Sequence, residues 1–305
     1  MSRAVIHETF GGPEVLEIRE VAEPHAGPGE VRVRVSAAGL NPVDWILAGS
    51  ADAAQRFGVV LPAGFGNDFA GVVDEVGDGA AGFAIGDRVF GGARGRAVAD
   101  YAVVRPGKDP VKHTPEGVDD VTASTLPIAG GTADAVINAI GVHAGDTVLV
   151  GGAAGGVGVF VVQLAKLAGA RVIGTSSPAA FDFLRDLGAE PVEYGAGLTE
   201  RVAALAPEGV TAAADMIGTE TALAAVDLGV APARIATIAG APPDGARATG
   251  GRDATPGALD RIAAAIAAGK LRVPIAASFP IERTRDAVEL QRARHVHGKV
   301  VVTLV

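Results

Sequence analysis

The spacing of apolar positions changes near residue 120. Before that point, short apolar runs are separated by glycine-containing breaks, and Val31, Val33 and Val35 alternate with Arg32 and Arg34 as in a half-buried strand. This β-rich part predicts strands at 3–7, 15–21, 30–37, 69–76, 88–90 and 98–104.

From about residue 123 the pattern is that of alternating helices and strands, which is typical of a doubly wound parallel sheet. A long helix is predicted at 122–140 and an irregular loop at 240–257. Strands are predicted at 147–150, 171–175, near 192, and at 212–217, 234–239, 273–279 and 299–304. Helices are predicted directly after the glycine turn that follows 147–150, and at 178–187, 199–205, 219–228, 258–268 and 283–294.

A glycine turn follows the strand predicted at 147–150. Its residues include Ala153, Gly155, Gly156, Val157 and Gly158. The first, second and last of these occupy the three glycine positions of the G-x-G-x-x-G fingerprint, with alanine in the first. Small residues let backbone N–H groups approach a pyrophosphate at the start of the next helix. A turn without a ligand is the alternative, and the complete strand–turn–helix–strand unit makes it the weaker one.

Composition limits the possible classes of protein. A chain of 305 residues is long for a single core, so two domains are expected. Zero cysteines exclude disulfides, thiolate zinc sites and a cysteine nucleophile. A formal charge of −9 argues against nucleic-acid partners. Because no apolar run reaches ~18 residues and no signal peptide is visible, we expect a cytoplasmic protein with no membrane partner.

Six segments, in order along the chain, resemble the zinc-independent quinone reductases of the zeta-crystallin type in the medium-chain dehydrogenase/reductase superfamily. They are Ala38-Gly-Leu-Asn-Pro-Val-Asp44, Gly66-Asn-Asp-Phe-Ala-Gly-Val-Val73, Gly86-Asp-Arg-Val89, Pro127-Ile-Ala-Gly-Gly-Thr-Ala133, the turn at 153–158 and Gly298-Lys-Val-Val-Val302. The resemblance implies an α/β protein with NADPH in a cleft between two domains. A β-rich GroES-like catalytic domain would comprise residues 1–122 and 270–305, and a Rossmann domain residues 123–269.

The resemblance also bears on metal content. Asn41 stands where zinc-dependent relatives place a catalytic cysteine, and the structural zinc lobe is absent. His295 and His297 are more simply explained as surface or packing residues than as a ligand pair. We therefore predict no metal, which leaves hydride delivery to an acceptor that conjugation already activates, such as a quinone or an enone.

The residues after the second Rossmann strand predict NADPH as the cofactor. Thr175, Ser176 and Ser177 stand where an NAD enzyme usually places an acid for the ribose 2′-hydroxyl. Ser177 and Pro178 suit a helix N-cap and first position, so Ser177 could serve as a cap, as a phosphate contact or as both. The chain departs from many relatives at 179–180, where alanines replace a Lys or Arg.

Asn41 and Asp44 are the catalytic candidates. By resemblance, Asn41 lies near the nicotinamide and donates a hydrogen bond to the substrate oxygen, while Asp44 orients Asn41 or a water. The alternatives are a turn and helix start for Asn41, and an ordinary first-turn carboxylate for Asp44. Relatives often carry a tyrosine soon afterwards; only Ser50 offers a hydroxyl here, so water could protonate the product.

Four more residues are expected at the cofactor. Three of them have a structural alternative, and Gly218 has no supporting sequence pattern of its own. They are Thr132 (or a buried helical threonine), Tyr194 (or core packing), Gly218 after the strand predicted at 212–217, and Lys299 (or a solvent-exposed lysine). Arg94 and Arg96, in a glycine-rich loop, are assigned no role.

Two classes of function remain open from the sequence. The first is an NADPH-dependent reductase of quinones or of activated carbon–carbon double bonds, as in enones and enoyl compounds. The second is a non-catalytic NADPH-binding regulatory protein. The resemblance implies a hydrophobic strand after the last core Rossmann strand, which in relatives commonly pairs across a dimer interface. Segment 246–257 lacks the β-branched alternation of such a strand, although shorter edge contacts at 234–239 could still form a dimer. We therefore expect a monomer or weak homodimer with a mobile 240–257 loop near the cofactor cleft.

Overall fold

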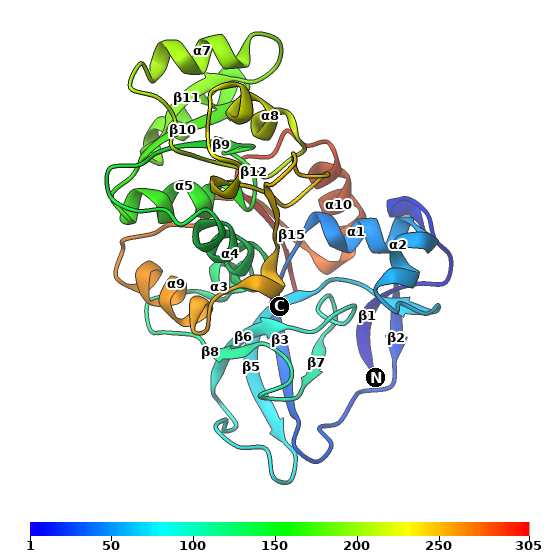
Figure 1. The fold of residues 1–305 in the computed structure, drawn as a ribbon. Helices are drawn as coiled ribbons and strands as arrows, with labels where there is room; N and C mark the ends of the chain where they lie inside the picture. The colour runs from blue at the N-terminus through cyan, green and yellow to red at the C-terminus, as the bar shows by residue number, and fades with distance from the viewer. Residues whose placement is uncertain (305) are drawn as a thin grey trace. The chain divides into compact units, whose positions relative to one another are not determined.

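The computed structural model describes residues 1–304, which form two compact units (Figure 1). Unit 1 contains Met1–Ile128 and the chain from Ile275 onward, and unit 2 contains Ala129–Pro274. The family resemblance implied boundaries at 122/123 and 269/270. Residues 123–128 lie in unit 1 because they pack on its strands: a Cβ atom at Gly39 would come within 2.3 Å of the Ser124 carbonyl oxygen.

Unit 1 is built on a seven-stranded sheet with the strand order β15-β16-β3-β5-β6-β8, in which β7 also pairs with β3. The strands are β3 (Val31–Gly39), β5 (Asp68–Val76), β6 (Arg88–Gly92), β7 (Tyr101–Val104), β8 (Val111–His113), β15 (Ile275–Pro280) and β16 (Lys299–Thr303). A second sheet contains β1 (Ser2–His7), β2 (Glu17–Val21) and the short β4 (Ala63–Gly64). The C-terminal strand β16 pairs antiparallel with β3, so both ends of the chain contribute to unit 1.

The helices of unit 1 are α1 (Pro42–Gly49), α2 (Ala51–Arg56), α3 (Asp120–Ala123) and α10 (Thr284–Arg292). Helix α1 begins directly after β3, with Asn41 as N-cap in an extended conformation and Pro42 in the first turn, where a missing N–H costs nothing. The single Trp of the chain, Trp45, lies in α1 and donates a hydrogen bond to Gln291 of α10 at 3.0 Å.

The helix predicted at 122–140 is interrupted, so that prediction was wrong in its extent. The structure has α3, then a π-helical stretch at Leu126–Gly130, then α4 (Gly131–Ala139). Pro127 has no N–H to donate, and the next N–H, that of Ile128, donates to the Asp68 carboxylate at 3.0 Å. Two consecutive α-helical hydrogen bonds are therefore lost at this point, and the helix cannot continue regularly.

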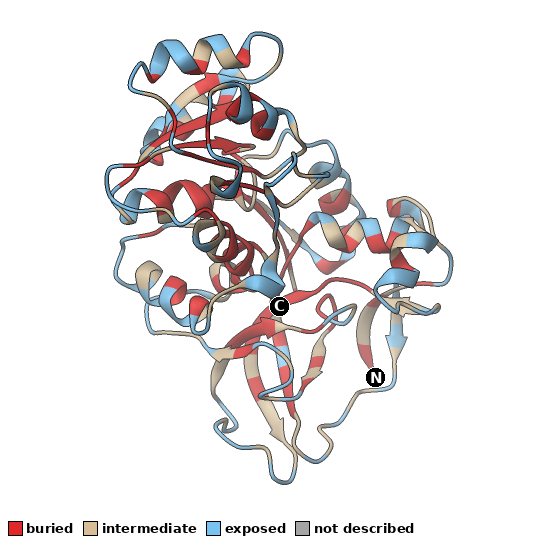
Figure 2. Ribbon diagram, in the orientation of Figure 1, coloured by how far each residue is buried: buried red, intermediate tan, exposed pale blue. Residues whose placement is uncertain are grey.

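Unit 2 is a parallel sheet of six strands in the order β11-β10-β9-β12-β13-β14, which confirms the doubly wound α/β prediction (Figure 1). Its strands are β9 (Thr147–Gly151), β10 (Arg171–Ser176), β11 (Glu190–Glu193), β12 (Ala212–Asp215), β13 (Ile235–Thr237) and β14 (Arg247–Ala248). Its helices are α4, α5 (Gly158–Leu167), α6 (Phe181–Asp186), α7 (Leu198–Leu205), α8 (Glu220–Asp227) and α9 (Ala258–Ala267). The central strands are buried along most of their length (Figure 2).

The segment 240–257 is largely irregular, as predicted, but it contributes one short element to the sheet. Arg247 and Ala248 form β14, which pairs parallel with β13 and ends the sheet. No helix within residues 1–304 is both long and apolar enough to span a membrane.

Candidate functional site

Five polar side chains form a buried cluster in unit 1, which we call the polar cluster. They are Asn41 and Asp44 at the start of α1, Asn67 and Asp68 at the start of β5, and Lys299 at the start of β16. All five are more than nine-tenths buried. Because β3 lies between β16 and β5 in the sheet, the chain around Asn41, which follows β3, meets residues from both neighbours.

Asn41 joins the charged members of the polar cluster. Its side-chain N–H groups donate to the Gly39 carbonyl at 3.2 Å and to Asp68 Oδ2 at 2.9 Å, and its Oδ1 accepts from Lys299 Nζ at 2.6 Å. Lys299 Nζ also donates to the Leu40 carbonyl at 2.7 Å. Both N–H groups of the Asn41 amide are therefore engaged within unit 1.

Asp44 holds the start of α1 together. Its Oδ2 accepts the backbone N–H of Asn41 at 2.6 Å, and its Oδ1 accepts a short hydrogen bond from Asn67 Nδ2. The two carboxylate oxygens of Asp68 differ in their hydrogen bonds. Oδ2 accepts from the Asn41 side chain and from Ile128 N, whereas Oδ1 is buried and has no partner among residues 1–304.

Burial dominates the electrostatics of the polar cluster. It raises the pKa of Asp44 to about 6, against the opposing effect of its hydrogen bonds to Asn41 and Asn67. It raises the pKa of Asp68 to about 7, although the nearby Lys299 opposes that shift. It lowers the pKa of Lys299, against the attraction of Asp68 and Asp44. Two acids and one base are thus held in a site that disfavours net charge.

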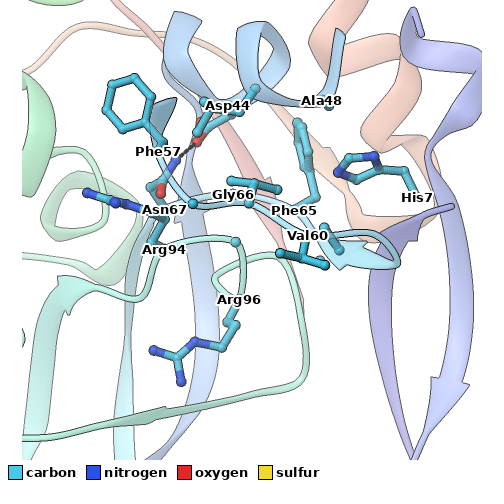
Figure 3. Close-up of a pocket in the computed structure, with 16 residues that line it drawn as sticks. His7, Asp44, Ala48, Phe57, Val60, Phe65, Gly66, Asn67, Arg94 and Arg96 are labelled. Carbon is cyan, nitrogen blue, oxygen red and sulfur yellow. Dashed lines mark hydrogen bonds between the residues drawn. The ribbon is translucent and has the colours of Figure 1, made fainter. Parts of the chain in front are cut away.

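A cavity of about 260 Å³ adjoins the polar cluster and is lined entirely by residues of unit 1 (Figure 3). Asp44 and Asn67 form part of its wall, and a dashed line in the figure marks the hydrogen bond between them. Apolar side chains contribute roughly half of the wall; they include Leu47, Ala48, Phe57, Val59, Val60 and Phe65.

Arg94 and Arg96, to which the sequence assigned no role, both line this cavity. They lie in a tight turn, closed by the Arg96 N–H donating to the Ala93 carbonyl at 2.8 Å and by Gly95 with φ of 66°. The turn is held closely against β4, since a Cβ at Gly64 would come within 2.2 Å of the Gly95 carbonyl oxygen. The glycines around the arginines were the only sequence signal for this arrangement.

The glycine turn of unit 2 connects β9 to α5, as predicted. The positive φ that the turn requires, 65°, falls on Gly152, one residue before the predicted fingerprint. Gly158 permits the start of α5 to lie close against the turn, because a Cβ there would be 2.2 Å from the Gly152 carbonyl oxygen. Ala153 fits in the first fingerprint position because it faces Gly174, where a Cβ would be 2.8 Å from that of Ala153.

The turn offers unused donors. The N–H groups of Ala154, Gly156 and Val157 donate to no acceptor within residues 1–304, whereas Gly155 N–H closes the turn onto Gly152 at 3.0 Å. Three free N–H groups at the start of the ten-residue helix α5 are what an oxyanion such as a pyrophosphate requires.

The end of β10 braces this turn. Thr175 accepts the Gly152 N–H on its hydroxyl at 3.2 Å and the Ala153 N–H on its carbonyl at 3.3 Å. Ser177 is the N-cap of the turn that begins at Pro178, as predicted, but its hydroxyl makes no capping hydrogen bond. An acid that sequence reasoning did not consider, Glu193, lies beside Ser176 in the parallel register of β10 and β11.

Comparisons with known proteins agree with this two-unit architecture. Residues 27–137 match the alcohol dehydrogenase GroES-like domain, and residues 187–302 match the zinc-binding dehydrogenase domain. The structure of the quinone oxidoreductase from Coxiella burnetii superposes with a TM-score of 0.86 at 30% identity, covering 100% of this chain and 99% of that one. The chain belongs to the quinone oxidoreductase family of the medium-chain dehydrogenase/reductase superfamily.

Two further relatives illustrate the family. The chain is 36% identical to a quinone oxidoreductase of Pseudomonas aeruginosa over 197 residues, which is 64% of this chain and 59% of that protein. The matched region thus spans less than two thirds of this curated relative. A mycobacterial protein solved in complex with NADPH superposes with a TM-score of 0.87 at 25% identity over 100% of both chains. The family is one of oxidoreductases.

The structure places the other site residues predicted from the family resemblance in two groups. Lys299 is 3% exposed and joins Asn41 and Asp44 in unit 1, so a solvent-exposed lysine is excluded. In unit 2, Gly218 follows the carboxyl end of β12, and Tyr194, 51% exposed rather than packed in the core, follows that of β11. Thr132 is buried in α4.

Sequence reasoning missed two buried side chains. Asn67 and Asp68 stood in a quoted motif without a role, and only the fold shows their partners. Among residues 1–304 there is no group of three or more His, Cys, Asp or Glu side chains placed to hold a metal ion.

Proposed function

We propose that this protein is an NADPH-dependent reductase that transfers hydride to a quinone or another conjugated carbonyl acceptor without a metal. The observation that carries the cofactor assignment is the turn after β9, where three backbone N–H groups have no acceptor within residues 1–304 and where Gly158 lets the start of α5 pack closely against the Gly152 carbonyl. The bound nicotinamide would supply the hydride. The family and its NADPH-bound member support the same assignment.

Most of the residues proposed to hold NADPH lie at the carboxyl ends of the parallel strands β9 to β12, and Thr132 lies in α4. The pyrophosphate would bind the N–H groups of the turn at 154–157. The adenosine half would lie along the ends of β10, β11 and β12, beside Ser176, Tyr194 and Gly218, and Thr132 is proposed at the nicotinamide. Nucleotides bind at this edge in open α/β sheets, because loops and helix N-termini converge there.

The residues of unit 1 would hold the acceptor. Asn41 and Asp44, the catalytic candidates from the sequence, are proposed here as positioning residues. The two amide N–H groups of Asn41 are engaged by Gly39 and Asp68, so Asn41 would act by fixing Asp68 and Lys299 rather than by donating directly to the acceptor. The reduced acceptor also needs one proton, which water could supply.

The central test is steady-state oxidation of NADPH and NADH across a panel of quinones and enones. Turnover of quinones with NADPH is the expected result. Turnover of enones alone would assign the protein to carbon–carbon double-bond reduction, and NADPH binding without any turnover would favour the regulatory alternative.

NADPH is expected to bind at least tenfold more tightly than NADH, because β10 ends in uncharged hydroxyl residues. Ser177→Asp is expected to reverse this preference, since a carboxylate repels the 2′-phosphate while remaining a good N-cap. Ser177→Asn is the matched control, because it is an equally good cap without the charge. Titration of both cofactors by calorimetry measures this. Equal affinity of the wild type for the two cofactors would show that Glu193, or no residue here, governs the choice.

A further inference from the structure

The cavity in unit 1 restricts what the acceptor can be, if the proposed function is correct. Its volume of about 260 Å³ lies below the roughly 300–1,000 Å³ of pockets for drug-sized ligands. Roughly half of its wall is apolar, with Phe57 and Phe65 among the lining side chains. A small, flat carbonyl compound of one or two rings fits this description.

Among the polar groups on the wall, only Asn67 offers an uncharged donor beside Asp44. Asn67 Nδ2 donates one N–H to Asp44 Oδ1, while its second N–H and the side-chain oxygen Oδ1 make no hydrogen bond within residues 1–304. The Asn67 oxygen is absent from the fully buried, unpartnered side-chain atoms of the described chain, so it is open to the cavity. Asn67 therefore lines the cavity with one unpaired side-chain N–H and an unpaired side-chain oxygen within residues 1–304.

The other polar groups fit a carbonyl oxygen less well. His7 Nδ1 lies 3.1 Å from the Thr9 carbonyl, an acceptor, so the neutral ring carries its proton there and leaves Nε2 as an acceptor. Arg94 lies over the Phe57 ring at 5.5 Å. Arg96 is exposed, and Figure 3 shows its side chain pointing away from Asp44 and Asn67.

Asp44 determines how the Asn67 amide is turned. An ionised Asp44 carries no proton and can only accept hydrogen bonds, and both of its oxygens do so. The Asn67 amide must therefore turn its NH₂ group, and not its oxygen, toward Asp44. We propose that Asn67 is the residue that hydrogen-bonds the carbonyl oxygen of a small conjugated acceptor in this cavity, and that Asp44 is the positioning residue that orients it. The N–H stabilises the charge that develops on that oxygen as hydride arrives.

The first experiment measures kcat for 1,4-naphthoquinone and 2-cyclohexenone at saturating NADPH. Asn67→Ala is expected to lower kcat about 100-fold, the effect of removing one donor to a developing oxyanion. The affinity for NADPH, measured separately, is expected to stay unchanged. Asn138→Ala, which alters an exposed asparagine of unit 2, is the matched control and should retain wild-type kcat.

The role of Asp44 is tested by a double-mutant cycle. Asp44→Asn keeps an acceptor for the Asn41 N–H but presents an NH₂ group to Asn67, which forces the Asn67 amide to turn over. Asp44→Asn should therefore lower kcat in the wild-type background and have little further effect in Asn67→Ala. Unfolding followed by Trp45 fluorescence reports whether the start of α1 is intact in each variant. Equal effects in both backgrounds would overturn the positioning role.

Two results would overturn the role of Asn67. One is wild-type kcat in Asn67→Ala, especially if Arg94→Gln or Arg96→Gln lowers it instead. The other is an equal loss of NADPH affinity, which would indicate a structural role. A wild-type protein that reduces neither acceptor would contradict the proposed function. Calorimetry with 1,4-naphthoquinone alone then decides: weaker binding to Asn67→Ala supports the inference, and equal or absent binding overturns it.

Discussion

Replacing Asp68 with asparagine is expected to stabilise unit 1 more at pH 8 than at pH 5, when the free energy of unfolding is compared with that of the wild type at each pH. The amide can keep both hydrogen bonds that Asp68 Oδ2 accepts, and it places an uncharged NH₂ group where Oδ1 has no partner within the described residues, 1–304. The substitution thus removes a buried charge with little change of shape, which distinguishes it from most substitutions of a buried polar residue.

The sign of this effect follows from the pKa of Asp68, which burial raises from its usual 3.8 to about 7. Between these values the folded chain binds more protons than the unfolded chain, so the contribution of Asp68 to stability is lost as the pH rises through the window. About two pH units of the window lie above pH 5. The advantage of Asp68→Asn is therefore expected to grow by about 2–3 kcal/mol from pH 5 to pH 8.

Urea unfolding followed by the fluorescence of Trp45, the single tryptophan, measures this change in unit 1. The matched control is Asp78→Asn, which removes an exposed acid of the same unit and should run parallel to the wild type. Parallel profiles for Asp68→Asn and the wild type would mean that Asp68 is ionised in the folded state at pH 5. The charge balance described for the polar cluster would then be wrong.

Replacing Gly158 with alanine is expected to lower NADPH affinity by roughly 5- to 150-fold. An added Cβ would be 2.2 Å from the Gly152 carbonyl oxygen and 2.7 Å from that of Ala153, both backbone atoms that cannot rotate away. The turn must shift, at a cost of about 1–3 kcal/mol, and its three free N–H groups shift with it.

Calorimetric titration with NADPH measures the loss, and circular dichroism checks that unit 2 remains folded. Gly250→Ala is the matched control, because no atom lies within 4 Å of the added Cβ and the backbone there is extended. Unchanged affinity in Gly158→Ala would show that the cofactor does not bind this turn.

The elements that the sequence predicted well are those with a local signal. The strand at 147–150, the glycine turn and the helix after it depend on residues within about twenty positions of one another, and all three were confirmed within a residue or two. The predicted helix at 122–140 was wrong because its interruption depends on a distant partner. The Ile128 N–H bonds Asp68, 60 residues away, and no local pattern shows this.

The site residues follow the same rule. Asn41 and Asp44 were predicted from the family resemblance, which rests in part on one short motif at a helix start. Lys299 opens a strand and resembles a surface lysine until the fold brings its ammonium to Asn41, 258 residues earlier. The cavity wall similarly depends on the contact between Gly64 and Gly95, which each look like ordinary loop glycines in the sequence.

The discontinuity of unit 1 has a consequence for the order in which the protein is assembled during synthesis. Unit 2 is a continuous stretch, Ala129–Pro274, and all six of its strands have emerged before β16 is made. Unit 1 lacks both β16 and the Lys299 ammonium until the last part of the chain arrives. Asp44 and Asp68 therefore cannot be buried with their cation until β16 has been made, after every strand of unit 2.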